Sequence, residues 1–355
     1  MFSKKITVPF FISHQGCPHD CLFCDQRRIS GAEGTLPTAE EITAKVTAWR
    51  ASAGAVPLEV AFFGGTFTAL QPSIQDALLA PISPFIISGD VTTIRISTRP
   101  DCIDTETVRR ISAQGVGIIE LGVQSMDDRI LDAAGRGHTA ADSIAAIRCI
   151  KNLGLTVGTQ LMPGLPGDTL AVSMASLDKV IMAGADFIRL YPVVVLRGTG
   201  LARLYEQGEY KPLSIEDGVT FCKLMLHKAV NSGVEVIRIG LQASVDLNAD
   251  NIIAGCFHPA LGNMVKSELF FDLLCKLFSN LNTEPVTINC HPYAMPEVFG
   301  YKGRNLERLN EMGFRSVTVK PELFCSRYDV NVITANGIAV DNIYSPLLYQ
   351  GDAGA

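Results

Sequence analysis

The sequence lacks the features that mark a membrane protein or a secreted protein. Its apolar residues never run for the roughly 18 consecutive positions that a membrane-spanning helix needs. Residues 1–11 include Lys4 and Lys5 but no long apolar stretch followed by a small-residue cleavage site, so no secretory signal is predicted. We therefore expect a cytoplasmic protein that has no membrane partner.

The sequence also lacks an excess of positive charge and the composition of a disulfide scaffold. Its 30 Lys and Arg residues are outnumbered by 36 Asp and Glu residues, which gives a formal net charge of −6. Such a surface repels phosphate on average, so nucleic-acid binding requires a local basic patch. Ten cysteines in 355 residues are no disulfide framework. In a reducing compartment they are free thiols, metal ligands or nucleophiles.

Apolar runs rich in β-branched residues alternate with amphipathic stretches over the first 240 residues. Continuous apolar runs are typical of strands that are buried on both faces of a parallel sheet. Their alternation with helices predicts an α/β fold, namely a partial or full TIM-like barrel of (β/α) units. The predicted strands are 6–12, 58–63, 92–97, 117–123, 155–161, 186–195 and 234–239, and the predicted helices include 38–50, 105–114, 139–153, 170–183 and 214–232.

The character of the sequence changes after Gly240, so we predict three parts: a barrel over 1–240, a helical connecting segment over 241–284, and a small α+β unit over 285–355. The connecting segment is polar and irregular at its start and contains a predicted helix over about 267–280. The last part is predicted to contain strands 286–290, 316–319 and 330–334 and a helix over 305–312.

The strongest local signal is a loop with three cysteines that directly follows the first predicted strand. Cys17, Cys21 and Cys24 have the spacing Cys-x3-Cys-x2-Cys on a segment that also contains glycine and proline. Three thiolates can converge on one soft metal centre, and they suggest a 4Fe–4S cluster with one iron left open. The alternatives are a zinc site that also uses His19 or His14, and three unconnected thiols.

This motif resembles the one that defines the radical S-adenosylmethionine (SAM) superfamily, including the aromatic Phe23 before the last cysteine. The resemblance implies a 4Fe–4S cluster whose open iron binds the amino and carboxylate groups of SAM. One electron from a reducing donor protein then cleaves SAM to methionine and a 5′-deoxyadenosyl radical. The cofactors carry this chemistry, and the protein supplies orientation and a dry barrel.

Further residues at predicted strand ends match the SAM-binding elements of that superfamily. Paired glycines let the backbone approach a ligand closely, and barrel sites lie at the C-terminal ends of strands. Ser97 stands where relatives often carry a carboxylate for the ribose, and Arg136 could form a fork with the SAM carboxylate or serve only structure. Glu120 could merely stabilise the barrel rim through an ion pair. The predicted SAM-binding residues are Gly64, Gly65, Thr66, Ser97, Gln124, Arg136 and Gln160.

Three sets of segments narrow the resemblance to the radical-SAM half of the Elongator catalytic subunit and its shorter bacterial relatives, over roughly residues 5–240. The resemblance implies modification of an RNA base, most plausibly in tRNA. It does not extend to an acetyltransferase domain, so acetyl transfer is not expected. Oxygen-independent coproporphyrinogen oxidases share two of the features and are the nearest rival family. The segments are 120–125 with 136–139, 162–167, and 189–192 with 198–199 and 208–210.

A short loop in the last part resembles the Gly-x-x-Gly loop of KH domains. Two glycines admit a phosphate, and the N-terminus of the following helix would face it. The alternative is a plain glycine-rich turn between a strand and a helix. The predicted nucleic-acid-binding residues are Gly300, Tyr301, Lys302, Gly303 and Arg304, in a region that is locally basic.

The remaining cysteines and the overall function leave alternatives open. Cys256, Cys275, Cys290 and Cys325 could bind a second metal, but buried thiols explain their irregular spacing more simply. The sequence favours a radical SAM enzyme that modifies RNA. The two alternatives are a radical SAM enzyme of tetrapyrrole-type metabolism and a non-enzymatic RNA-binding protein with a structural or redox-sensing cluster.

Overall fold

The computed structural model describes residues 5–25, 35–241, 247, 250–279, 281, 285–323 and 326–349, and the chain divides into two compact units. The first unit comprises 1–214 with 234–257, and the second comprises 215–233 with 258–355. The expected three-part division differs from this one, because helix α10 (Ile215–Asn231) groups with helix α11 (Leu261–Phe278). Lys223 of α10 and Asp272 of α11 form an ion pair of 2.6 Å.

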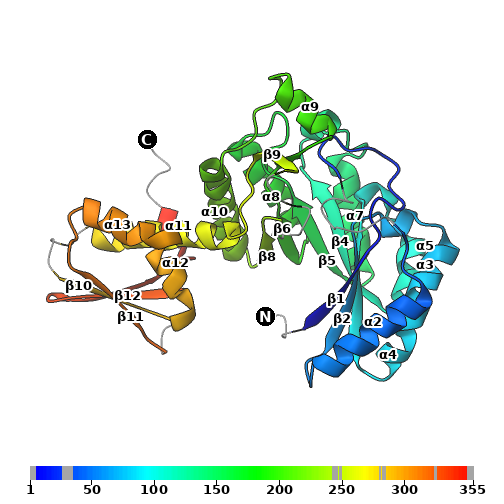
Figure 1. The fold of residues 1–355 in the computed structure, drawn as a ribbon, viewed down its shortest axis with the longest axis horizontal. Helices are drawn as coiled ribbons and strands as arrows, with labels where there is room; N and C mark the ends of the chain where they lie inside the picture. Colours follow the sequence, from blue (N-terminus) through cyan, green and yellow to red (C-terminus); the bar gives the residue numbers. More distant parts are fainter. Residues whose placement is uncertain are drawn as a thin grey trace. The chain divides into compact units, whose positions relative to one another are not determined.

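The first unit is built on a seven-stranded, fully parallel sheet in the order β1-β2-β3-β4-β5-β6-β8, curled into a half-barrel (Figure 1). The predicted parallel α/β barrel is confirmed in its partial form. Among the described strands, β1 and β8 are the two edges of this sheet. The strands are β1 (Ile6–Phe11), β2 (Leu58–Phe63), β3 (Val91–Thr98), β4 (Val116–Gln124), β5 (Thr156–Leu161), β6 (Phe187–Leu190) and β8 (Glu235–Ile239).

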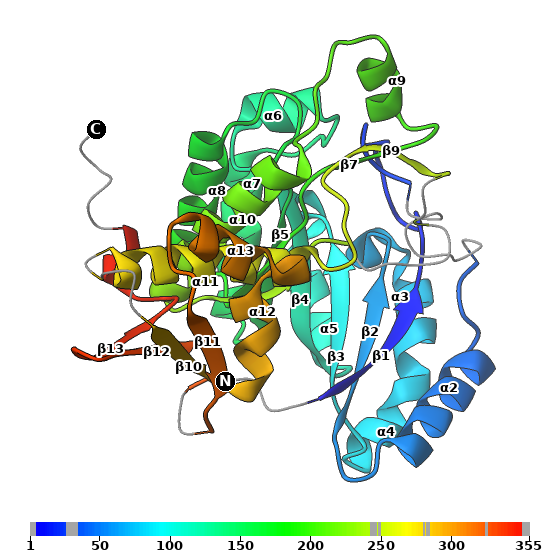
Figure 2. The same ribbon diagram turned by 60° about the vertical axis from the view of Figure 1, so that its left-hand side comes forward.

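Helices of this unit lie along the outside of the sheet (Figure 2). Several begin at capping residues that the sequence offers: Thr38 and Thr139 each form a capping box, and Thr169 accepts a hydrogen bond from the Val172 amide. The helices are α2 (Ala39–Ser52), α3 (Pro72–Leu79), α4 (Ser83–Ile87), α5 (Thr105–Ser112), α6 (Asp128–Ala133), α7 (Ala140–Asn152), α8 (Leu170–Ala183) and α9 (Gly200–Glu206). The sequence analysis predicted the short helix α5 but not α3, α4, α6 or α9.

The long strand predicted over 186–195 is interrupted in the structure. It is split into β6 and β7 (Val194–Leu196), and Pro192 lies between them. Proline has no amide hydrogen to give to a sheet, so the ladder ends there and the chain changes direction. Strand β7 pairs in antiparallel fashion with β9 (Ile252–Gly255) in a separate two-stranded sheet.

Alternate residues of the half-barrel strands have opposite characters. On the side that packs under the helices, Val8, Phe10, Val60 and Phe62 are at most 4% exposed and form the core. On the other side of the sheet, the residues are polar or line a cavity, as Ser97 of β3 does. A parallel sheet with one polar face is unusual, because such sheets are normally apolar on both faces. This polar face indicates that it surrounds a functional site.

The second unit has a four-stranded sheet in the order β11-β10-β12-β13, in which β10 runs parallel to β11 and antiparallel to β12. Strand β10 lies at the predicted residues, and the chain from β10 to β11 follows a strand–helix–helix–strand order. Its elements are β10 (Val286–Cys290), α12 (Met295–Phe299), α13 (Arg304–Glu311), β11 (Val317–Pro321), β12 (Asp329–Thr334) and β13 (Gly337–Asn342). No described helix in either unit is both long enough and apolar enough to cross a membrane.

Candidate active site in the half-barrel

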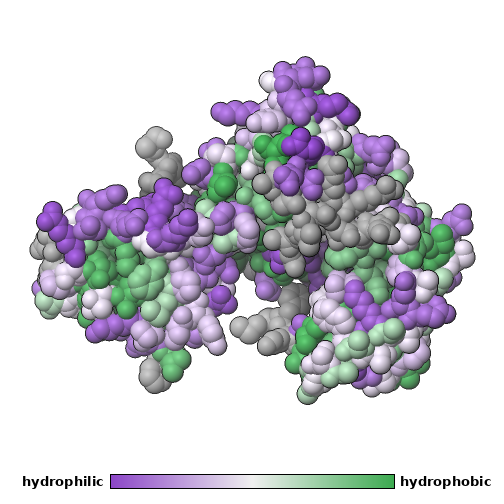
Figure 3. All heavy atoms as spheres, in the orientation of Figure 1, coloured by the Kyte–Doolittle hydropathy of each residue, from purple (hydrophilic) through white to green (hydrophobic). Residues whose placement is uncertain are grey.

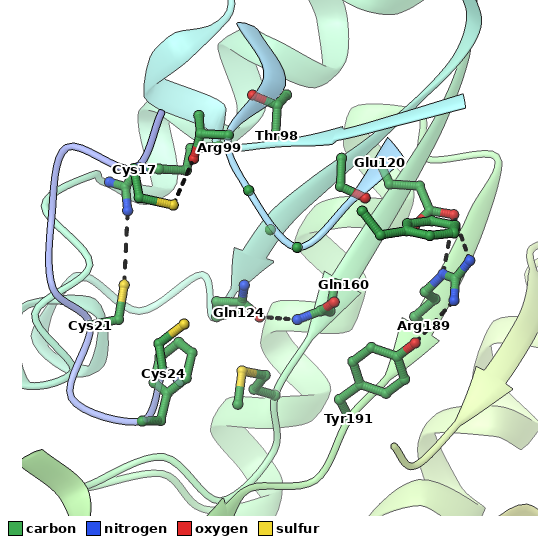
Figure 4. A pocket seen from close by; sticks show the side chains of 18 of the residues that line it. Cys17, Cys21, Cys24, Thr98, Arg99, Glu120, Gln124, Gln160, Arg189 and Tyr191 are labelled. Atoms are coloured by element: carbon green, nitrogen blue, oxygen red, sulfur yellow. Dashed lines mark hydrogen bonds and ion pairs between the residues drawn. The ribbon is translucent and has the colours of Figure 1, made fainter. Parts of the chain in front are cut away.

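The three motif cysteines lie together in one cavity of about 800 Å³ in the first unit (Figure 4). Their loop follows β1, and none of the three forms a disulfide. The Sγ atom of Cys17 lies 3.3 Å from the hydroxyl oxygen of Thr66. Gly16 has a φ of +74°, and a Cβ atom there would lie 2.4 Å from the Thr66 carbonyl oxygen. Glycine is therefore required for the cysteine loop to approach the end of β2.

The glycine pair at the end of β2 holds the cysteine loop in place. The amide of His14 donates to the carbonyl oxygen of Gly64 over 2.9 Å. A Cβ atom at Gly65 would lie 2.4 Å from the carbonyl oxygen of Ile12 and 2.6 Å from that of Gln15. Both glycines also line the cavity. The pair thus has a packing role that the sequence analysis did not foresee, whatever ligand it meets.

All seven residues of the predicted SAM-binding set line the cavity that the cysteines line. The carboxamides of Gln124 and Gln160 meet across it, because Gln160 Nε2 donates to Gln124 Oε1 over 3.0 Å. Gln124 has a φ of +69°, a left-handed conformation that is rare for a residue with a side chain. Backbone strain of this kind clusters at binding sites. The conformation aims the Gln124 side chain toward the middle of the cavity (Figure 4).

The guanidinium groups of two buried arginines approach the sulfur of Cys21. Arg136 Nη1 donates to the Cys21 Sγ atom over 3.0 Å, and its Nη2 donates to the carbonyl oxygen of Gly122 over 2.6 Å. The Nη1 atom of Arg99 lies 4.0 Å from the same sulfur. Arg99 and Arg136 are 4% and 6% exposed, respectively. The sequence analysis placed Arg136 in the site and missed Arg99, although Arg99 directly follows strand β3.

A second ionic cluster lies on the side of the cavity away from the cysteines (Figure 4). Glu120 accepts hydrogen bonds from Arg95 and Arg189, and Arg95 also pairs with Glu59 over 2.7 Å. Burial is the largest single influence on the pKa of Arg189 and would lower it, but the Glu120 carboxylate and the Tyr191 side chain together outweigh burial and raise that pKa. Glu120 is therefore an ion-pair residue, as one interpretation of the sequence had it. The sequence analysis did not identify its partners.

His138 is a buried residue of this region that the sequence analysis also missed as a site residue. Its Nε2 atom lies 3.3 Å from the carbonyl oxygen of Val123, the residue before the strained Gln124. Burial first, and then the charges of Arg136 and Arg99, lower the pKa of His138 to about 4. The imidazole is therefore neutral at pH 7 and donates to Val123 through Nε2–H. The sequence feature that could have identified His138 is its position two residues after Arg136.

The Gly-x-x-Gly loop lies in the second unit, between α12 and α13. Tyr301, Lys302 and Arg304 are exposed, and the Lys302 Nζ atom lies 5.5 Å from the centre of the Tyr301 ring. Lys302 has a φ of +57°. Gly300 is buried against Asn305, whose side chain would clash with a Cβ atom there at 2.6 Å. Figure 3 shows that the exposed surface over α13 is hydrophilic.

The remaining cysteines give no sign of a second metal centre. Cys256 and Cys290 are buried and belong to different units, and Cys275 is half-buried. Cys325 lies outside the described residues. Over the part of the chain that the structure describes, no group of three or more His, Cys, Asp or Glu side chains is arranged to hold a single metal ion.

Two family models match the chain. The Radical SAM superfamily model matches residues 11–180, and the Radical_SAM C-terminal domain model matches residues 185–270. In solved structures, the archaeal Elp3 of Methanocaldococcus infernus, with an N-terminal deletion, superposes with a TM-score of 0.62 at 23% identity. That superposition covers 76% of this chain and 63% of the archaeal one, and it shows that the two share a fold.

Curated relatives match over part of the chain. A tRNA uridine(34) acetyltransferase of Methanocaldococcus jannaschii is 28% identical over 59% of this chain and 41% of its own length. An uncharacterized protein of the same organism is 30% identical over 64% of this chain and 73% of its own length. Elongator complex protein 3 of Mus musculus is 28% identical over 45% of this chain and 33% of its own length.

The chain spans about two fifths of the length of the tRNA uridine(34) acetyltransferases that it matches. The two family models together cover most of the half-barrel, including the cysteine loop, both cavity arginines and the paired glutamines. Superfamily members use a 4Fe–4S cluster and SAM, and the donor set fits both groups: three thiols and two buried guanidinium groups meet in one cavity. The chain belongs to the radical SAM superfamily and is a radical SAM enzyme.

Proposed function

We propose that Cys17, Cys21 and Cys24 hold a 4Fe–4S cluster and that SAM binds beside it across the C-terminal ends of the strands. When bound, these groups supply a 5′-deoxyadenosyl radical that abstracts a hydrogen atom. The observation that carries the proposal is the cavity itself, because its lining combines the three thiols with all seven predicted SAM-binding residues. Polar groups that converge at the strand ends of a barrel are typical of a cofactor site.

Different residues of the chain would contact different parts of SAM. Gly64, Gly65 and Thr66 present backbone close to the cysteine loop, where the amino acid part of SAM would lie. The Ser97 hydroxyl and the carboxamides of Gln124 and Gln160 offer donors and acceptors for the ribose and the base. Arg136 offers positive charge to the SAM carboxylate, and its buried Nε–H finds no acceptor among the described residues.

We further propose that the substrate is an RNA base, most plausibly in tRNA. Two kinds of support favour this class: the tRNA-modifying names of the curated relatives, and the exposed side chains of Tyr301, Lys302 and Arg304 on the Gly-x-x-Gly loop of the second unit. A glycine-rich loop at the start of a helix can clamp a nucleic-acid backbone. The match covers 41% and 42% of the length of those relatives, so the proposal does not include acetyl transfer.

Anaerobic reconstitution with iron and sulfide, followed by an assay for 5′-deoxyadenosine with and without bulk tRNA, tests the proposed function. We expect that SAM cleavage requires a reductant, that the amount of 5′-deoxyadenosine formed changes when tRNA is added, and that the tRNA recovered from the reaction carries a modified base. A variant in which all three motif cysteines are Ala is the matched control. A protein that binds the cluster but never cleaves SAM would instead indicate a structural or sensing cluster. SAM cleavage at the same rate with and without tRNA, and with no change in the tRNA, would favour a small-molecule substrate.

A further inference from the structure

The surroundings of Cys21 are more positive than the chain as a whole. Two guanidinium groups approach its sulfur, from Arg136 at 3.0 Å and from Arg99 at 4.0 Å, in a protein whose formal net charge is −6. Asp101 pairs with Arg99 through two hydrogen bonds of 3.0 Å each. Within the described part of the chain, no carboxylate pairs with Arg136. The two cations therefore share one carboxylate and one sulfur.

The fold fixes both guanidinium groups, so they cannot easily turn away. Arg99 also donates to the backbone carbonyl oxygen of Arg136, which links the two residues directly. The Arg136 guanidinium lies over the ring of Phe23, at 6.0 Å from the ring centre, and donates to Gly122. Burial at 4% and 6% exposure keeps water from screening either charge.

The segment that carries Arg136 is packed against the cysteine loop. The amide of Leu22 donates to the carbonyl oxygen of Ala134 over 3.1 Å. A Cβ atom at Gly137 would lie 2.5 Å from the imidazole of His19. The same two charges also act on His138, because Arg136 and Arg99 follow burial among the causes that lower its pKa.

Hydrogen bonds and positive charge at a cysteine sulfur raise the reduction potential of an iron–sulfur cluster, because reduction adds one electron and hence one negative charge. We propose that Arg136 and Arg99 are positioning residues that set this potential through Cys21, while Asp101 tempers the effect of Arg99. The electron comes from an external one-electron donor. This inference rests on the proposed function, since it needs the cluster on Cys17, Cys21 and Cys24.

The proposal predicts that two substitutions shift the midpoint potential of the cluster in opposite directions, which general damage to the fold would not produce. Arg136→Gln removes a positive charge and should lower the midpoint potential of the reconstituted cluster. Asp101→Asn removes the carboxylate that offsets Arg99 and should raise it. Arg136→Lys keeps the charge and should fall nearer to the wild type than Arg136→Gln. Arg129→Gln, at an arginine whose side chain is 87% exposed, is the matched control and should leave the potential unchanged.

The measurement is a redox titration with dithionite, followed by electron paramagnetic resonance of the reduced cluster, without SAM and then with it. Titration of SAM binding to the same proteins separates the two roles of Arg136. An Arg136→Gln protein with the wild-type potential overturns the inference, even if its affinity for SAM is lower. The same holds if Asp101→Asn and Arg136→Gln shift the potential in the same direction. A wild-type protein that assembles no cluster overturns the proposed function itself, and this inference with it.

Discussion

Two pairs of largely buried arginines occur at the half-barrel cavity, and they differ in how their charges are balanced. Arg99, Arg136 and Arg189 line the cavity, and Arg95 contacts its lining through Glu120. On the side away from the cysteines, the guanidinium groups of Arg95 and Arg189 are matched by two carboxylates, so the cluster is neutral. Beside the cysteine loop, Asp101 is the one carboxylate among the described residues that pairs with either Arg99 or Arg136, and both guanidinium groups approach the sulfur of Cys21. The carboxylates of the first cluster belong to Glu59 and Glu120.

The difference separates a structural cluster from one that is prepared for a ligand. A balanced buried cluster satisfies its own hydrogen bonds and needs nothing further. An unbalanced cationic cluster is costly to bury, so its retention indicates an anionic partner. The thiolate sulfurs of a bound cluster and the carboxylate of SAM would both meet that need. We therefore propose that one end of the cavity serves stability and that the other end serves cofactor binding.

Removal of the motif cysteines should give the largest effect and should act only at the unbalanced end. The Cys17→Ala, Cys21→Ala and Cys24→Ala variants should each lose the charge-transfer absorbance of the reconstituted cluster, because three thiolates are needed to hold three irons. Iron content and the visible spectrum after anaerobic reconstitution measure this loss. Cys149→Ala, at a half-buried thiol outside the cavity lining, is the control that should retain the cluster. Full retention of iron by the triple variant would contradict the assignment.

Glu120→Gln should unbalance the charges of the cluster away from the cysteines and should lower the free energy of unfolding more than the other substitutions proposed here. The variant leaves Arg95 and Arg189 with an uncharged partner, and loss of one member of a buried ionic cluster typically costs about 3–5 kcal/mol. Urea unfolding followed by circular dichroism measures the free energy of unfolding. Asp76→Asn is the matched control, because Asp76 is half-exposed beside Arg110 and such pairs contribute about 1 kcal/mol or less. Equal losses for both variants would remove the distinction between the two ends.

The sequence predicted those parts of the molecule that depend on local pattern. Strand β2 and helix α8 lie at the predicted residues, because apolar runs and helical periodicity are local properties. The cysteine loop was found for the same reason, since its spacing lies within eight residues. Pro192 shows the limit: the sequence analysis ran one strand through it, although a proline in a central strand argues against such an assignment.

The parts that escaped prediction depend on contacts between distant residues. Arg99 and Cys21 are 78 positions apart in the sequence, and Glu120 and Arg189 are 69 positions apart. No local pattern indicates which arginine meets which carboxylate or sulfur once the sheet has curled. The role of Gly65 in packing against Ile12 likewise appears only when β1 and β2 lie side by side.

The pH dependence of stability should sharpen the comparison, because His138 reports the positive field near Cys21. Its pKa is about 4 in the folded protein, against an ordinary value of 6.5. Between these values the unfolded chain binds a proton that the folded chain does not, so stability should fall as the pH decreases from 6.5 to 4. The linkage amounts to on the order of 3 kcal/mol. Urea unfolding at a series of pH values measures the slope.

Two variants decide whether His138 causes that slope. His138→Gln cannot titrate and should flatten the dependence of the unfolding free energy on pH over this window. Arg136→Gln removes one of the charges that lower the pKa of His138, so it should narrow the window from its acidic side. A slope that is unchanged in both variants would show that other groups titrate there.

The smallest effect is expected at a third basic region, the exposed loop of the second unit, where water and salt screen charge. Changing both Lys302 and Arg304 to Asp should weaken RNA binding several-fold without altering RNA-independent SAM cleavage, because neither residue lines the half-barrel cavity. If each side chain neutralises one phosphate, the log–log dependence of affinity on salt should become shallower by about 1.4 for single-stranded RNA. Binding to a fluorescent single-stranded RNA at several salt concentrations measures both quantities.

The matched control changes Arg315 and Lys320 to Asp, which reverses the same number of exposed charges elsewhere in the unit. If the control weakens binding as much as the loop variant does, the loop has no special part in RNA recognition and only the net charge of the unit matters.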